Sequence, residues 1–104
     1  MFVSIDTTPI NKKVKTRGQK DQTKLSLGLL ESTLLGANQS DWKIVFGHHP
    51  CFSGGHNSSS DKLIQKMLPI MKNGGVDMYL AGHDHNMQHW RDSISDSEIG
   101  TLKI

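Results

Sequence analysis

The stretch VDMYLAGHDHN, residues 76–86, decides how the chain is expected to fold. Val76 to Ala81 form an apolar run that predicts a buried strand, and Gly82 and two histidines follow at its end. In an extended backbone, residues i and i+2 point to one side, so His83 and His85 would face one ligand. Because imidazole suits Zn, Fe, Cu and Ni, the stretch predicts a metal site at the end of a strand.

A second stretch, GHHP at residues 47–50, has the same build. It follows the apolar run Trp42 to Phe46, which predicts another buried strand. A helical pattern from Asp61 to Lys72, which Pro69 should kink or divide, separates the two strands. Strand, helix and strand predict a βαβ unit with parallel strands and a right-handed crossover. Both histidine loops should then leave the same edge of the sheet, where open α/β sheets bind ligands.

The rest of the chain predicts a short first strand, a basic loop, one long helix and a terminal hairpin. Leucines at helical spacing favour the long helix and give it an apolar face. The expected segments before the first histidine loop are a strand over Phe2–Ile5, a loop over residues 10–20 and a helix over Asp21–Ala37. The apolar face of this helix comprises Leu25, Leu27, Leu29, Leu30, Leu34 and Leu35. The later segments are a long loop over Gly47–Ser60, with Ser60 or Asp61 as the next helix cap, and antiparallel strands Gln88–Arg91 and Ile99–Ile104 joined by the turn Asp92–Glu98.

Length and composition exclude several classes of protein. At 104 residues the chain is one domain, 1–104, and its net charge of +2 gives no sign of a nucleic-acid partner. No apolar run approaches the length of a membrane span, and the first residues lack the pattern of a signal peptide. The single cysteine, Cys51, excludes an internal disulfide. A basic cluster favours a solvated loop over a binding patch, and two weak glycosylation sequons count only in a secreted protein. The cluster comprises Lys12, Lys13, Lys15, Arg17 and Lys20, and the sequons begin at Asn38 and Asn57.

The chain contains six histidines, more than an average composition would give. Five of them, at positions 48, 49, 56, 83 and 85, lie in the two loops, whereas His89 is expected on a strand surface. A lone histidine is more often a structural residue. Two Gly-His strand ends brought together by one crossover favour metal binding instead. Asp84 would point away from the metal and would orient its loop as a hydrogen-bond acceptor.

These motifs resemble the C-terminal motifs of the calcineurin-like metallophosphoesterases, and most closely those of the purple (tartrate-resistant) acid phosphatases. The resemblance rests on GHHP at 47–50 and GHDHNMQ at 82–88, and it extends to the helix around Leu29 and Leu30 and to the strand that ends in Asp6. It implies an α/β fold, namely a partial metallophosphoesterase sandwich with a βαβ unit plus a C-terminal hairpin. Residues 1–104 would be the C-terminal part of an incomplete four-layer α/β/β/α domain.

The resemblance also implies a dinuclear metal centre that hydrolyses phosphate monoesters. By their positions in the motifs, His48 and His83 would bind the divalent ion and His85 the ferric ion. The pair would be Fe(III) with Fe(II), Zn(II) or Mn(II), roughly 3.5–4 Å apart, and would activate water for attack on phosphorus. His56 would contact the phosphate and help to protonate the leaving group, and His49 receives no ligand role.

The remaining metal ligands of the family are absent from this sequence. They belong to N-terminal motifs with an Asp, an Asp followed by Tyr, and a Gly-Asn-His segment, and Tyr79 does not match the iron-binding tyrosine. We therefore expect the chain to be the C-terminal portion of such an enzyme, with the missing N-terminal half as its structural partner. Alone, it should expose an apolar face of its sheet and show little or no phosphatase activity.

Three other functions stay open. Phosphodiesterases and nucleotidases of the same superfamily share the histidine loops. A non-catalytic remnant could bind a partner protein, although the intact His48, His83 and His85 argue against it. A mononuclear zinc site with these three histidines would fit the open-position pattern of catalytic zinc. The sequence does not identify the substrate, and the compartment would be secreted or lysosomal only if the parent protein follows the family.

Overall fold

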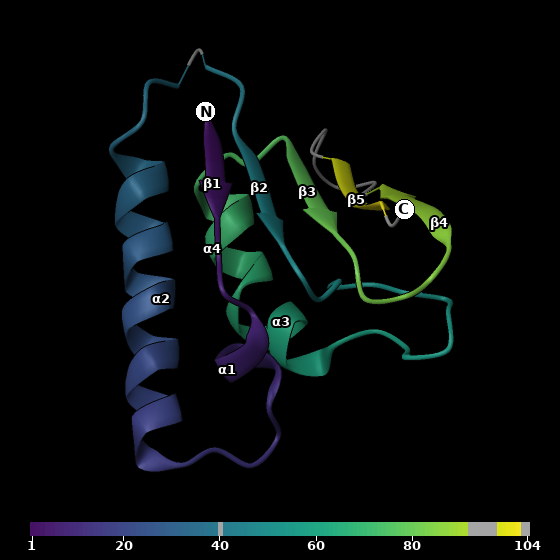
Figure 1. Cartoon of the computed structure of the whole chain (residues 1–104). Coiled ribbons are helices and arrows are strands. Elements are labelled where there is room, and N and C mark those ends of the chain that lie inside the picture. The colour runs from purple at the N-terminus through teal and green to yellow at the C-terminus, as the bar shows by residue number, and fades with distance from the viewer. Residues whose placement is uncertain (40, 92–97, 103–104) are drawn as a thin grey trace.

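A five-stranded sheet forms the centre of the fold in the computed structural model, which describes residues 1–39, 41–91 and 98–102 (Figure 1). β1, β2, β3 and β5 run parallel to one another, and β4 pairs antiparallel with β5. The expected α/β class, the parallel central strands and the antiparallel terminal pair are confirmed. Residues 92–97 of the expected turn and residues 103 and 104 of the expected last strand lie outside the described residues. The strands are β1 (Phe2–Ser4), β2 (Ile44–Gly47), β3 (Met78–Ala81), β4 (Met87–Arg91) and β5 (Glu98–Leu102), and their order in the sheet is β1-β2-β3-β5-β4.

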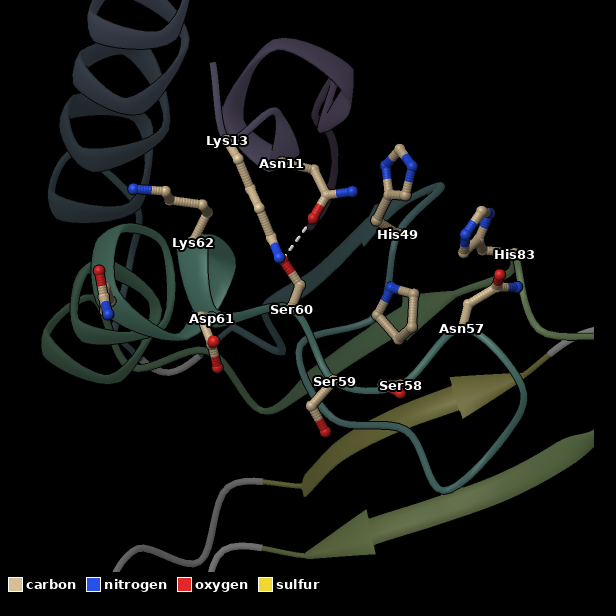
Figure 2. A pocket seen from close by; sticks show the side chains of 12 residues that line it. Asn11, Lys13, His49, Asn57, Ser58, Ser59, Ser60, Asp61, Lys62 and His83 are labelled. Atoms are coloured by element: carbon tan, nitrogen blue, oxygen red, sulfur yellow. Dashed lines mark hydrogen bonds between the residues drawn. The ribbon is translucent and has the colours of Figure 1, made fainter. Parts of the chain in front are cut away.

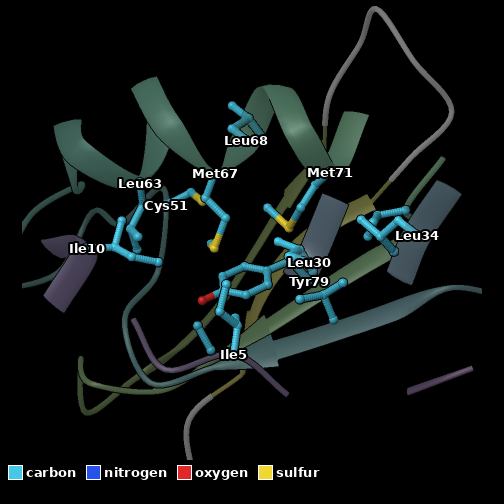
Figure 3. Packing of buried hydrophobic residues seen from close by; sticks show 13 residues of the cluster. Ile5, Ile10, Leu30, Leu34, Cys51, Leu63, Met67, Leu68, Met71 and Tyr79 are labelled. Carbon is cyan, nitrogen blue, oxygen red and sulfur yellow. The ribbon is translucent and has the colours of Figure 1, made fainter. Parts of the chain in front are cut away.

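Helices pack against one face of this sheet. Their buried side chains join one apolar cluster with Val45 of β2 and Tyr79 of β3 (Figure 3). The long helix α2 contacts both α1 and α4, and α1 contacts α3. None of the described helices combines the length and the apolar character that a membrane crossing requires. The helices are α1 (Thr8–Asn11), α2 (Arg17–Leu35), α3 (Asp61–Lys66) and α4 (Leu68–Asn73).

The long helix begins earlier than the leucine pattern predicted. It starts at Arg17 rather than Asp21, and the expected loop over residues 10–20 also contains the end of α1. Thr16 explains the early start. Its side chain accepts a hydrogen bond from the Gln19 amide, and the Gln19 side chain accepts one from the Thr16 amide. This reciprocal capping box satisfies two amide groups that the first helical turn leaves without partners.

The apolar face of α2 is narrower than predicted. Leu30 and Leu34 are buried, but Leu25, Leu29 and Leu35 are 63%, 57% and 60% exposed. The helix covers the structure from one side only, so a single stripe of leucines is enough for its contacts with neighbouring elements. The three outer leucines therefore lie on the solvent side of the helix.

Pro69 divides the second helical segment, as predicted. α3 ends at Lys66 and α4 begins at Leu68, so that Pro69 lies in the first turn of α4, where its missing N–H interrupts no helical hydrogen bond. The predicted cap is also confirmed, because the Ser60 side chain accepts a hydrogen bond from the Leu63 amide. The two short helices return the chain to the start of β3, parallel to β2.

The two faces of the sheet differ in burial. Val45 and Tyr79 are paired in register, are fully buried and belong to the apolar cluster. Tyr79 packs under the helices (Figure 3). Phe2 and Phe46 point to the opposite face, where they are 73% and 41% exposed. The expected exposure of an apolar sheet face is confirmed for the strands whose side chains are described.

Candidate metal centre

The two histidine loops leave the sheet side by side. Gly47 and Ala81, the last residues of β2 and β3, are paired in register, and the Gly82 amide donates to the His48 carbonyl at 2.9 Å. The loops therefore begin at the same level of the carboxyl edge, as the parallel βαβ unit predicted. Nε2 of His48 lies 3.0 Å from Nδ1 of His83, so the first histidine of one loop meets the first histidine of the other.

His49 completes a cluster of three imidazoles. The centroid of its ring lies 4.7 Å from that of His48 and 4.7 Å from that of His83. One ligand nitrogen from each ring falls within 4.8 Å of the other two, and this is the one such group of metal-ligating side chains in the part of the chain that the structure describes. The family resemblance gives His49 no ligand role. The doubled histidine at a strand end was the sequence signal that could have included it.

The other expected site residues lie outside this cluster. His85 is exposed and does not belong to the group of three. His56 is exposed on the long loop between β2 and α3, and the sequon residues Asn38 and Asn57 are exposed as well. His89 is exposed on β4, as predicted for a strand surface.

The backbone at His83 is not extended. His83 has a φ of 75°, in the left-handed region that non-glycine residues rarely adopt and that often occurs at functional sites. The expectation of an extended backbone over this segment is wrong, so the rule that residues i and i+2 point to one side does not apply to His83 and His85. Instead, the Asp84 amide donates to the Gly82 carbonyl at 3.0 Å, and the Asn86 amide donates to the Asp84 carbonyl at 2.9 Å. The segment is thus a run of tight turns.

Thr7, the N-cap of α1, and Tyr79 of β3 are buried and hold His49 in place. The hydroxyl of Thr7, which is 1% exposed, lies 2.8 Å from Nδ1 of His49 and accepts the His49 amide at 3.0 Å. The Tyr79 hydroxyl donates to the His49 carbonyl at 2.6 Å. The pKa of His49 is lowered to about 4, mainly by burial and to a smaller extent by the nearby imidazoles of His48 and His83. His49 is therefore neutral near pH 7, which is the form that binds a metal.

Asp84 ties the second histidine loop to the first. Its carboxylate is 1% exposed and accepts hydrogen bonds from the Ser53 hydroxyl, from the Asn57 amide at 3.0 Å and from Asn57 Nδ2 at 2.7 Å. The Ser53 hydrogen bond is the main reason that the pKa of Asp84 lies below its ordinary value, and the Asn57 donors add to it. The predicted role of Asp84 as an acceptor that orients the loop is confirmed.

A polar cavity of about 660 Å³ opens beside the cluster (Figure 2). His49 and His83 form part of its wall, and Lys13 of the basic segment reaches into it from the opposite side. Amide, hydroxyl and ammonium groups dominate the lining, so the cavity suits an anionic ligand. The lining residues are Asn11, Lys13, His49, Pro50, Asn57, Ser58, Ser59, Ser60, Asp61, Lys62, Gln65 and His83.

The donor set of the cluster fits one transition-metal ion. Zinc–nitrogen bonds of about 2.0–2.1 Å in tetrahedral geometry place ligand nitrogens about 3.3 Å apart, and His48 and His83 already lie 3.0 Å apart. Among the described residues, no carboxylate oxygen belongs to this group, so it contains no group that could bridge two ions. The described residues thus supply one metal position, and a second position would need further ligands.

Comparison with known proteins identifies a family and several relatives. Residues 3–87 match the family described as calcineurin-like phosphoesterase. Purple acid phosphatase 17 of Arabidopsis thaliana is 37% identical over 109 residues, which cover 93% of this chain and 32% of the relative. Human tartrate-resistant acid phosphatase type 5 is 36% identical over 58 residues, which cover 56% of this chain and 18% of the relative.

A similar solved structure carries the description "GAP50 the anchor in the inner membrane complex of Plasmodium". It superposes with a TM-score of 0.80 at 31% identity and covers 96% of this chain, which in turn covers 30% of that structure. Glideosome-associated protein 50 of Plasmodium falciparum is 33% identical over 93 residues, 84% of this chain and 22% of the relative. The chain spans about a third or less of the length of the relatives it matches.

Proposed function

The chain belongs to the calcineurin-like phosphoesterase family, and we propose that it supplies one part of a metal-dependent enzyme that hydrolyses phosphate monoesters. The similarity to purple acid phosphatases, which the two histidine loops first indicated, is confirmed. The observation that carries the proposal is the contact of His48 with His83 across two parallel strands. Two loops remote in sequence provide converging imidazoles, as a metal-assisted hydrolase requires.

The proposed roles follow from the positions of the side chains. His48 and His83 hold one divalent ion, Fe(II), Zn(II) or Mn(II), and His85 contributes to a second, ferric site whose other ligands come from outside this set. When bound, such a pair of ions polarises the phosphoryl group and lowers the pKa of water. Asp84 keeps the turn that carries His83 and His85 in place through its hydrogen bond with Ser53.

The cavity beside the cluster is where the ester would bind. Lys13 offers a positive charge, and Ser58 offers a hydroxyl donor for phosphate oxygens. His56, adjacent in sequence to the loop residues that line the cavity, would protonate the leaving group. These groups recognise the phosphate itself, so they favour phosphate monoesters as a class over any one of them.

The test is a complementation assay with p-nitrophenyl phosphate as monoester and bis(p-nitrophenyl) phosphate as diester. The chain is assayed alone and mixed with the N-terminal portion of a purple acid phosphatase, in each case with iron and zinc supplied. We expect little or no turnover by the chain alone and monoester turnover by the mixture, lost in His48→Ala and His83→Ala. Robust turnover by the chain alone, or a mixture that is indifferent to these substitutions, would contradict the proposal. Preference for the diester would support the phosphodiesterase alternative.

A second candidate function is protein binding without catalysis. The exposed Phe2 and Phe46 on the open face of the sheet favour it, and the similarity to a structure described as an anchor in the inner membrane complex of Plasmodium is a reason to test it. The same assay separates the two candidates. A mixture that assembles into a stable complex but never turns over either ester, with both ions present, would favour the binding module.

A further inference from the structure

We propose that His48, His49 and His83 form a mononuclear site for one divalent transition-metal ion, with zinc as the best-fitting ion, and that Thr7 is the positioning residue of His49. The site departs from the ligand set that the family resemblance implies. In this site His49 is a metal ligand, although the family motifs give it no such role. The site shares two ligands with the proposed function but concerns ion binding only. Hydrolysis can therefore fail while the zinc site is present, and the zinc site can be absent while hydrolysis occurs.

The three nitrogens are already close to the spacing that an ion requires. Ligand nitrogens in a tetrahedral zinc site lie about 3.3 Å apart. His48 Nε2 and His83 Nδ1 lie 3.0 Å apart, and all three ligand atoms lie within 4.8 Å of one another. Closure needs movements of at most about 1.5 Å. Rotation of the exposed His48 ring and the half-buried His83 ring supplies such movements.

Thr7 selects the nitrogen that His49 offers. Nδ1 of His49 lies 2.8 Å from the Thr7 hydroxyl oxygen, which also accepts the His49 amide. A hydroxyl oxygen has two lone pairs, so it can accept both N–H groups. With its proton on Nδ1, His49 keeps the lone pair of Nε2 for a metal ion. Metal-ligating histidines regularly donate their other ring N–H in this way, which fixes the ring and its tautomer.

The backbone that carries His49 is held from two sides. The Tyr79 hydroxyl donates to the His49 carbonyl at 2.6 Å, and Thr7 receives the His49 amide. Gly47 lets these groups approach, since a Cβ at this position would lie 2.8 Å from Thr7 Cγ2 and 2.8 Å from the Tyr79 hydroxyl. Thr7 is 1% exposed and Tyr79 is fully buried, so the clamp belongs to the core of the fold. His49 is thus pre-organised to a degree that the exposed His85 is not.

The fourth position of the ion faces the polar cavity. His49 and His83 line both the cluster and the cavity wall (Figure 2). Three protein ligands with one open position are the arrangement of catalytic rather than structural zinc. Lys13 and Asn57 also line this cavity, so the open position would accept water or a small oxyanion such as inorganic phosphate.

Zinc titration of the purified chain by isothermal calorimetry tests the site with two matched pairs of variants. His49→Gln and His85→Gln each remove one imidazole from a histidine loop, and Thr7→Val and Thr7→Ser remove or keep the buried hydroxyl. We expect one zinc ion per chain, a loss of at least about 100-fold in affinity for H49Q, about 10–100-fold for T7V, and little change for H85Q and T7S. Failure of the wild-type chain to bind zinc, or an H49Q variant that binds like the wild type, overturns the inference.

Imidazole nitrogen NMR on the wild-type chain gives a second readout that needs no variant and no activity. Zinc should shift the ring-nitrogen resonances of His48, His49 and His83 and leave those of His85 in place. Perturbation of His48, His83 and His85 with His49 unchanged would overturn the inference and would restore the ligand set of the dinuclear family. Binding of two ions per chain would overturn it as well. Loss of complementation activity with intact zinc binding would count against the proposed function alone.

Discussion

Replacing Asp84 by alanine should destabilise the chain by about 2–4 kcal/mol. The carboxylate accepts hydrogen bonds from the Ser53 hydroxyl and from two donors of Asn57, and hydrogen bonds to a charged group contribute about 1.5–3 kcal/mol each. Asn57 is exposed, so water can replace most of what its donors lose. Ser53 is 7% exposed, and its hydroxyl would be left buried without an acceptor. The expected loss of stability is therefore closer to the contribution of one strong hydrogen bond than to that of three.

Urea unfolding followed by circular dichroism measures this loss. Asp84→Asn keeps the volume and one acceptor oxygen, so it should cost less, about 1–2 kcal/mol. Asp41→Ala serves as the matched control because Asp41 is exposed, and surface substitutions of this kind usually change stability by less than about 0.5 kcal/mol. An Asp84→Ala variant as stable as the control would refute the assignment of Asp84 as the anchor between the two histidine loops.

Four further predictions concern the same fold. Because the pKa of Asp84 is lowered in the folded state, the stability that its carboxylate contributes is complete above pH 3.8 and is lost as pH falls through the lower folded value. At pH values below about 4, the urea midpoint of the wild type should therefore fall more steeply than that of Asp84→Asn. Gly47→Ala should cost about 1–3 kcal/mol in thermal unfolding, since its new Cβ would lie 2.8 Å from the Tyr79 hydroxyl. Tyr79→Phe should cost about 0.5–1.5 kcal/mol in urea, the value of its hydrogen bond to the His49 carbonyl. Thr16→Ala should cost about 1 kcal/mol through the lost helix cap, with reduced helical ellipticity at the same temperature.

Much of the fold was readable from local chemistry. The apolar runs before the two Gly-His pairs gave β2 and β3, Pro69 gave the division between α3 and α4, and Ser60 gave the cap of α3. Each of these rests on a rule that acts over a few residues. The parallel pairing then followed from the right-handed crossover, and with it the meeting of His48 and His83. A long-range contact could be predicted because the topology leaves one arrangement.

The composition of the metal cluster could not be predicted in this way. The spacing of His83 and His85 suggests a shared ligand only while the chain is extended, and the left-handed backbone of His83 removes that premise. A tight turn held by a buried Asp84 is a tertiary effect, because its partners Ser53 and Asn57 lie in another loop. The early start of α2 differs from this case, since its capping signal is local and could have been found.

The order of the strands explains why the cluster contains His49. β1, β2 and β3 lie side by side and parallel, so their carboxyl ends share one edge of the sheet, and the residues Thr7, His49 and His83 follow them in turn (Figure 1). Thr7, which follows the first strand, thus contributes the hydroxyl that contacts the His49 ring after the second strand. The His49 ring in turn lies beside the His83 ring after the third strand. The position of His49 therefore depends on the segment after β1, whereas the contact of His48 with His83 depends only on β2 and β3. A change at Thr7 must weaken the hold on His49 while it spares the contact of His48 with His83.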